Sequence, residues 1–234
     1  MTKRKAITMA DLMAQLEEDP AHLTSRQHQA AEHELREREV QIASQPLLDE
    51  LAAAGYPLVN FDELLSRYAP LKEPVVNVLL SRVLGVRDKS VQQQVVRALG
   101  ASAVPFSGMS ITRLFDSTDS ESLRFAIANT LAEAPVTGVS DWLLRAARDA
   151  STGTAQQMLL LAVARHIEPT RASPLLLELL DALPGHAALA LAEVGGGEEL
   201  KALRLKYETT RGWVKTQIGR AIAVIERRIS LRES

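Results

Sequence analysis

Apolar and small residues recur in helical register about every thirty residues through the last two-thirds of the chain. The pattern is clearest in the segments VQQQVVRALG (91–100), LRFAIANTLA (123–132), AQQMLLLAVA (155–164), GHAALALA (185–192) and VKTQIGRAIA (214–223). One aligned apolar position in each, at Leu99, Leu131, Val163, Leu191 and Ile222, gives spacings of 32, 32, 28 and 31 residues. This length suits two helices with their turns. The chain is therefore predicted to be a helical repeat protein.

From about residue 60 onward the helix signals come in pairs. The predicted pairs are 73–86 with 90–101, 109–118 with 121–134, 140–150 with 153–167, 173–182 with 185–195, and 198–210 with 213–229. Before the first pair, Asn60 and Glu63 have the spacing of an N-terminal cap for a short helix over residues 61–68. Pro174 is expected in the first turn of its helix, and Pro184 and Gly185 mark a bend. Five hairpins in series predict a right-handed α-solenoid over residues 60–234.

Residues 1–59 are predicted to form a separate N-terminal helical cap. Thr8 and Asp11 have capping-box spacing for a short helix over residues 8–18. A long charged helix is expected over residues 21–53, with a kink or break near Ser44 and Gln45 caused by Pro46. Gly55 is a natural helix stop. The long helix is either a polar cap over the first repeat or a protruding arm that binds a partner.

Composition narrows the class of protein. Hydrophobic residues make up 46% of the chain and aromatic residues only 4%, which favours an all-α core rich in Leu and Ala over a sheet core. The chain has no cysteine, which excludes disulfides, thiolate nucleophiles and cysteine metal ligands. No apolar run has the length of a signal-peptide core or a membrane span. A cytoplasmic protein without membrane contact is expected.

Charge is unevenly distributed along the chain. Residues 1–50 carry 6 Lys and Arg against 10 Asp and Glu, whereas residues 198–234 carry 9 against 5. Opposite charge at the two ends favours head-to-tail self-contact or orients a charged partner. The alternative is that both ends are simply solvated helices, and the oligomeric state stays open.

Enzyme chemistry is not indicated by any motif. His28 and Glu32 share a helix face, but two ligands do not make a metal site. The chain contains no HExxH, GxSxG, GxxxxGK[ST] or GxGxxG pattern. The glycine run at 195–197 is followed by Glu198 and Glu199, which would repel an anion. We therefore predict a protein without catalytic residues, metal or cofactor.

A turn aspartate followed by an apolar-Arg dipeptide resembles the HEAT-like (armadillo-type) helical repeat family. Asp119 with Leu123-Arg124 carries the best match. Looser matches are Asp88 with Val91-Gln92 and Asp149 with Ala155-Gln156. The likeness covers about residues 60–230. The segments LEEDP and PLLDELAAAG are also similar to small bacterial HEAT-like proteins without a settled activity.

The resemblance implies a curved stack whose second helices line a concave face that binds other macromolecules. With Leu99 buried, Gln93 and Arg97 point away from the core. The same register in the other repeats also includes Gly185. The candidate binding residues are Gln93, Arg97, Phe125, Asn129, Gln157, Leu161, Leu189, Thr216 and Arg220.

This face is apolar in its middle and polar or basic at its ends, which suits a helix or an extended segment of a partner protein. The alternative is that Phe125, Leu161 and Leu189 pack between repeats. The resemblance also implies that Arg124 forms a structural ion pair with a loop carboxylate, Asp119 or Asp88.

Nucleic acid is the alternative partner, because some HEAT-like solenoids resemble DNA glycosylases that hold a duplex in a basic groove. Phosphate binding needs clustered Lys and Arg. The available basic residues are Arg97, Lys215, Arg220, Arg227 and Arg228. Trp142 and Trp213 either stack on bases or, at the helix starts where they lie, staple a turn or fill a repeat interface. With an uncharged middle, the face favours a non-catalytic protein-binding adaptor or inhibitor.

Overall fold

The computed structural model describes Met9 and residues 20–233. These residues form twelve α-helices, one 3-10 turn and two strands of two residues each, which confirms the predicted all-α class. The short helix predicted over residues 8–18, with Thr8 and Asp11, falls outside the described residues except for Met9.

Helix α2 (Pro20–Ala53) runs without interruption through Pro46. Of the two predicted alternatives at Ser44 and Gln45, the break is therefore wrong, and the kink stays a prediction. Three leucines that follow the proline are almost fully buried: Leu47, Leu48 and Leu51. Their burial outweighs the single backbone hydrogen bond that proline removes. The helix ends as predicted, because Gly55 has a φ of 92° and the Tyr56 amide donates to the Leu51 carbonyl over 2.8 Å.

The chain divides into two units, Met1–Gln45 and Pro46–Ser234. In the first, every described side chain from Thr24 to Glu39 is exposed. The second unit includes residues 46–59, which the sequence pattern assigns to the cap. The domain boundary predicted after residue 59 stays a prediction.

All five predicted helix pairs are present in the second unit, after the short helix α3 (Glu63–Tyr68). The pairs are α4 (Glu73–Arg82) with α5 (Lys89–Leu99), α6 (Met109–Ser117) with α7 (Glu121–Glu133), α8 (Ser140–Arg148) with α9 (Ala155–His166), α10 (Pro169–Glu178) with α11 (Pro184–Val194), and α12 (Gly197–Thr209) with α13 (Gly212–Glu233). A 3-10 turn, η1 (Ala150–Thr152), precedes α9. Helix α10 starts earlier than predicted, so Pro169 occupies its first turn and Pro174 lies inside it.

Polar side chains in the turns fix where helices begin. The Asp88 carboxylate accepts the amides of Ser90 and Val91 at 2.8 and 3.1 Å. Ser120 caps α7 in the same way. Asn60 accepts the Glu63 amide over 3.2 Å, but α3 begins at Glu63, and Asp62 rather than Asn60 stands at its N-cap position.

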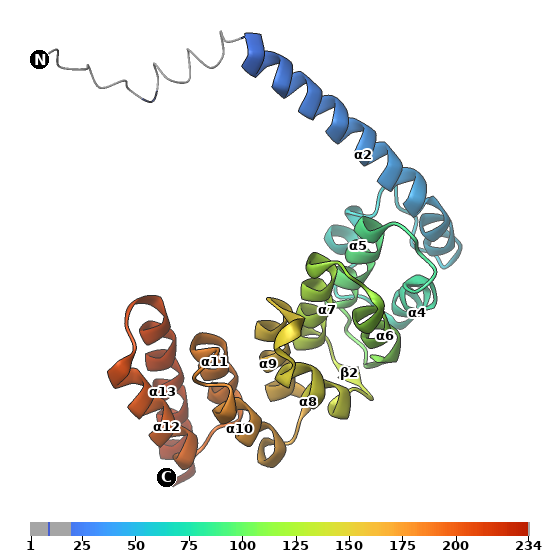
Figure 1. Ribbon diagram of the computed structural model, residues 1–234. Helices are drawn as coiled ribbons and strands as arrows, with labels where there is room; N and C mark the ends of the chain where they lie inside the picture. Colours follow the sequence, from blue (N-terminus) through green and yellow to red (C-terminus); the bar gives the residue numbers. More distant parts are fainter. Residues whose placement is uncertain (1–8, 10–19, 234) are drawn as a thin grey trace, which may run out of the picture. The chain divides into compact units, whose positions relative to one another are not determined.

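The second helices of the pairs pack in series, α5 on α7, α7 on α9, α9 on α11 and α11 on α13. A series of first helices also forms, because α10 packs on both α8 and α12. Figure 1 shows these elements following one another in chain order through the second unit. Leu99, Leu131, Val163 and Leu191 are fully buried. Ile222 is only half-buried, because α13 is the last helix of its series.

Loops and helix ends link one hairpin to the next. Strand β1 (Phe106–Ser107) pairs in parallel with β2 (Val136–Thr137), and Leu71 forms a similar bridge with Ser102. Carbonyls near the C-terminal ends of α5, α7 and α11 accept hydrogen bonds from side chains of the next second helix. The donors are Thr130, Arg165, His166 and Arg228. The carbonyls at a helix C-terminal end have no partner within the helix, and their hydrogen bonds to these side chains join neighbouring hairpins.

Acid is expected to destabilise the fold through two half-buried histidines. Burial is the main cause that lowers the pKa of His166 below its usual 6.5, although its bond to the Leu131 carbonyl opposes the shift. Burial also lowers the pKa of His186. The unfolded chain therefore binds more protons just below pH 6.5, so this stability is complete above that pH and is lost as pH falls. Circular-dichroism melts from about pH 7 to about pH 5 should show a falling midpoint.

His166→Gln keeps a donor for the Leu131 carbonyl and should make the midpoint fall less steeply on acidification. If both this variant and His186→Gln kept the full pH dependence of the unchanged protein, the assignment to the two histidines would be contradicted.

Candidate interaction surface

The nine candidate residues lie in one register on helices that pack in series; together they are called the second-helix face. Gln93 and Arg97 lie on α5, Phe125 and Asn129 on α7, Gln157 and Leu161 on α9, Leu189 on α11, and Thr216 and Arg220 on α13. None of the nine is buried, and Arg97, Phe125, Thr216 and Arg220 are exposed. One direct link joins this face to the next helix, from the Gln93 amide group to the Ser122 carbonyl at 3.4 Å.

The apolar members of the face remain accessible to solvent. Phe125 is 38% exposed, and Leu161 and Leu189 are half-buried. Residues near them in sequence are fully buried instead, among them Ile127 and Leu160. Packing between repeats therefore uses only part of the surface of these three side chains.

The first-helix series has a different surface, in which charges pair across neighbouring hairpins. Asp141 on α8 accepts from Arg171 on α10 at 2.8 Å, and Arg148 pairs with Glu178 at 3.3 Å. On the second-helix face, none of the candidate positions on α7, α9 and α11 carries a charge. Helices α8 and α10 thus carry charges that pair between hairpins, whereas the centre of the second-helix face consists of neutral amides and apolar groups.

Trp213 extends the face, and it was not among the candidate residues. It is 58% exposed at the start of α13, with its ring 6.3 Å from that of His186, centre to centre. A Cβ built on Gly185 would lie 2.9 Å from the indole ring. Gly185 shares the register of Gln93 and Phe125, so the indole covers the position where that register has no side chain. An exposed aromatic of this kind is a common anchor for partners.

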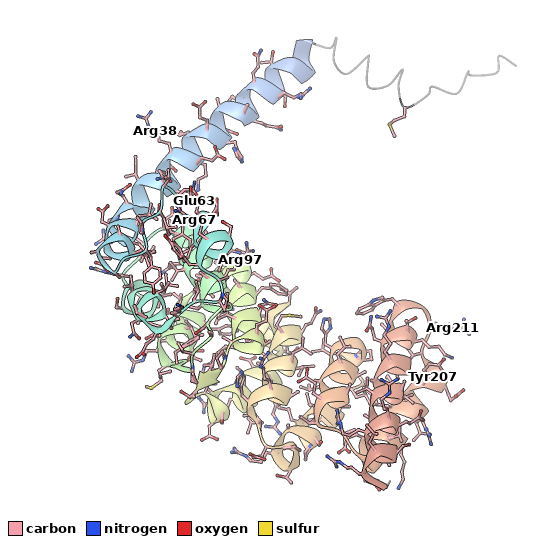
Figure 2. All side chains as sticks on the ribbon, turned by 180° about the vertical axis from the view of Figure 1, so that it is seen from behind. Arg38, Glu63, Arg67, Arg97, Tyr207 and Arg211 are labelled. Carbon is pink, nitrogen blue, oxygen red and sulfur yellow. The ribbon has the colours of Figure 1, made fainter. Side chains whose placement is uncertain are left out.

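The basic residues lie at the two ends of the series. Figure 2 shows Arg97 on α5 and Tyr207 on α12. The Lys215 ammonium lies 4.3 Å from the centre of the Tyr207 ring. Arg228 donates to two carbonyls of the α11 end, which removes it from the residues free to bind phosphate.

Arg124 does not form the predicted ion pair. Among the described residues, Asp119 pairs with Lys89 of the preceding hairpin. That lysine is the main cause of the lowered pKa of Asp119, and Arg124 contributes least. The Arg124 guanidinium lies 5.7 Å from the centre of the Phe115 ring. Asp119 precedes the first turn of α7 and is exposed, where a long lysine from the neighbouring hairpin reaches it.

Gln92 and Gln156 stand where the repeat pattern places Arg124, and both close their own hairpins. The Gln92 amide group donates to the Val83 carbonyl at 3.3 Å. The Gln156 amide group donates to the Ala147 carbonyl at 2.8 Å. Buried glutamine thus satisfies a carbonyl at the end of the first helix.

A cavity of about 320 Å³ lies beside Arg124. Its lining residues are Phe115, Asp116, Arg124, Trp142, Arg145, Ala146, Asp149, Ser151 and Thr152. The Trp142 indole donates to both Asp116 oxygens at 3.1 Å and packs edge-on against Phe115, with centroids 5.1 Å apart. Trp142 therefore joins α6 to α8. None of the nine face residues lines this cavity.

The residues that the structure describes also bear on a metal site, a membrane span and the glycine loop. No three His, Cys, Asp or Glu side chains in that part of the chain are grouped to hold a metal ion. None of the described helices combines the length and the apolar character needed to cross a bilayer. The Gly196 amide donates to the Glu199 carboxylate at 2.7 Å, so the glycine loop already holds an anion of its own.

Comparison with protein-family models, with curated proteins and with solved structures finds no match to this chain. The HEAT-like resemblance therefore rests on its turn and helix motif. Any functional proposal has to be argued from the surfaces described above.

Proposed function

We propose that this protein is a non-catalytic cytoplasmic adaptor or inhibitor that binds a helix or extended segment of another protein. The binding site is the second-helix face, extended by Trp213. The observation that carries the proposal is the accessible, uncharged centre of this face. Two ion pairs of the first-helix series instead join α8 to α10 across neighbouring hairpins.

The architecture proposed with this function is a right-handed solenoid of about five HEAT-like hairpins behind an N-terminal cap. Support comes from serial packing, in which α7 packs on α5, α9 and its own partner α6. The loop bridges and the side-chain caps on helix ends recur from hairpin to hairpin. Contacts limited to neighbours are typical of repeat proteins. In such a stack the second-helix face is the concave one.

A protein segment fits the chemistry of the face. Phe125, Leu161 and Leu189 offer apolar contact area, as required by an amphipathic helix laid in a groove. Gln93, Asn129 and Gln157 supply amide groups that both donate and accept hydrogen bonds. The exposed indole of Trp213 adds an aromatic anchor at one end.

Nucleic acid is the less favoured partner. Its binding depends on neutralising phosphates with Lys and Arg. Only Arg97 and Arg220 among the nine positions are basic, and three helices of the series separate them. Arg228 is already bonded to carbonyls of α11.

Phe125→Glu combined with Leu161→Glu should abolish recovery of the partner when the tagged protein is purified from its native cells. Two buried carboxylates in the centre of an interface lower affinity by about a hundredfold or more. Mass spectrometry of the retained material, with and without nuclease, identifies the partner. We expect a near-stoichiometric protein that resists nuclease.

Leu205→Glu is the matched control, because Leu205 is 75% exposed on α12, outside the face. A second variant, Arg97→Glu with Phe125→Glu, changes only exposed residues. It tests the same face if replacement of the half-buried Leu161 unfolds the first variant. Undiminished partner recovery with a folded variant would refute the proposed face. Loss of all bound material after nuclease would favour nucleic acid.

A further inference from the structure

Two arginines line the cavity near the turns of the second and third hairpins, and each has guanidinium donors without a hydrogen-bond acceptor among the described residues. Arg124 Nε is buried and has no hydrogen-bond partner in the described part of the chain. Arg145 lines the same cavity and is exposed. Within residues 20–233 it forms no hydrogen bond or ion pair. A buried guanidinium donor without an acceptor is unfavourable, which makes its surroundings a place to look for a ligand.

Each carboxylate on the cavity wall accepts a hydrogen bond from a donor other than the two arginines. Both oxygens of Asp116 accept the Trp142 indole N–H at 3.1 Å. Asp149 accepts the Ser151 amide at 2.9 Å. Hydrogen bonding from Ser151 is the main cause of the lowered pKa of Asp149, and the charge of Arg124 is a smaller cause. Asp149 is therefore ionised, yet it forms no ion pair with Arg124.

We propose that this cavity binds an oxyanion, a carboxylate or phosphate group of a small molecule, between the guanidinium groups of Arg124 and Arg145. Guanidinium presents a planar fork of donors that matches both kinds of oxyanion. A volume of about 320 Å³ is at the lower end of the range for small-ligand sites. The site goes beyond the proposed partner face, with which it shares no residue.

The lining also argues for a single anionic group rather than a polyanion. Two arginines are balanced by two aspartates, so the cavity attracts a ligand through directed hydrogen bonds more than through net charge. Phe115 and Trp142 form an aromatic wall for the rest of the molecule. A nucleic-acid strand would meet the carboxylates of Asp116 and Asp149 as well.

Tryptophan fluorescence provides a direct test, because the chain has only two tryptophans. In a Trp213→Phe variant, Trp142 on the cavity wall is the sole reporter. Sodium phosphate and sodium glutarate are titrated separately against sodium chloride of equal ionic strength. We expect a saturable change in Trp142 emission with at least one oxyanion and none with chloride. Comparison of the two dissociation constants shows whether the cavity prefers phosphate or carboxylate.

Arg145→Ala in this background should raise the apparent dissociation constant by about tenfold, as expected for losing one charge-assisted hydrogen-bond pair. Arg124→Lys keeps the charge but loses the fork and should weaken binding similarly. Arg113→Ala is the control, because Arg113 is exposed on α6 and does not line the cavity. Phe125→Glu with Leu161→Glu should leave oxyanion binding unchanged.

No saturable change with either probe would overturn the proposal, and so would saturable binding that Arg145→Ala leaves unaltered. Because Arg145 is exposed, its replacement keeps the test decisive even where an Arg124 variant unfolds.

Discussion

Gly108→Ala should lower the free energy of unfolding by about 2–3 kcal/mol, the range for overpacking a filled core. A Cβ at Gly108 would lie 2.4 Å from Val139 Cγ1 and 2.5 Å from Val136 Cγ1. Both valines are buried, and β-branched side chains rotate away poorly. Urea denaturation followed by circular dichroism measures the change.

Gly197→Ala is the control for this measurement. A Cβ at Gly197 has nothing within 4 Å and the residue has no positive φ, so its substitution should change stability by less than about 0.5 kcal/mol. Equal stability of the two variants would mean that the loops carrying β1 and β2 do not pack as described. The small residue at 108 is thus required because two hairpins meet there.

The helix pairs were predictable because each second helix repeats the same buried register. Leu99, Leu131, Val163 and Leu191 follow from the periodicity alone, and all four are buried. The same register placed the nine face residues at positions that remain accessible. Helical periodicity alone sets which side chains share a face of a helix, so this prediction requires no information about neighbouring helices.

Features that depend on contacts between distant segments were not predictable. The break expected at Pro46 followed a local rule, whereas the burial of Leu48 and Leu51 decides the outcome. The pairing of Asp119 with Lys89 joins residues 30 apart in sequence. No motif within one repeat specifies that pairing.

The candidate sites likewise depend on contacts between residues that are distant in the sequence. Gly185 leaves its position in the register without a side chain, and the Trp213 ring covers that position. This relation can be seen only once the repeats are aligned with one another. The cavity was missed because its arginines come from different helices, α7 and α8. The repeat motif marked Arg124 as structural and gave no indication that its Nε lacks a partner.

Leu131→Ala should lower the free energy of unfolding by about 2–5 kcal/mol, the range for removing a large buried side chain. Leu131 is fully buried near the C-terminal end of α7, in the middle of the second-helix series. The Leu131 carbonyl oxygen also accepts a hydrogen bond from His166 Nε2 at 2.7 Å. A shift of α7 therefore disturbs α9 directly. Hydrogen exchange followed by mass spectrometry measures both the size and the place of the effect.

The place of the effect tests the proposed solenoid. Helix α7 packs on α5, α6 and α9, whereas α12 packs on α13 and α10. In a stack stabilised by neighbours, exchange should speed up mainly in α5, α7 and α9, and α12 and α13 should keep their protection. Leu205→Ala, at a residue 75% exposed on α12, should leave exchange unchanged everywhere. Equal loss of protection in α7 and α13 would instead show that residues 46–234 unfold as one cooperative unit, contrary to a stack of separable hairpins.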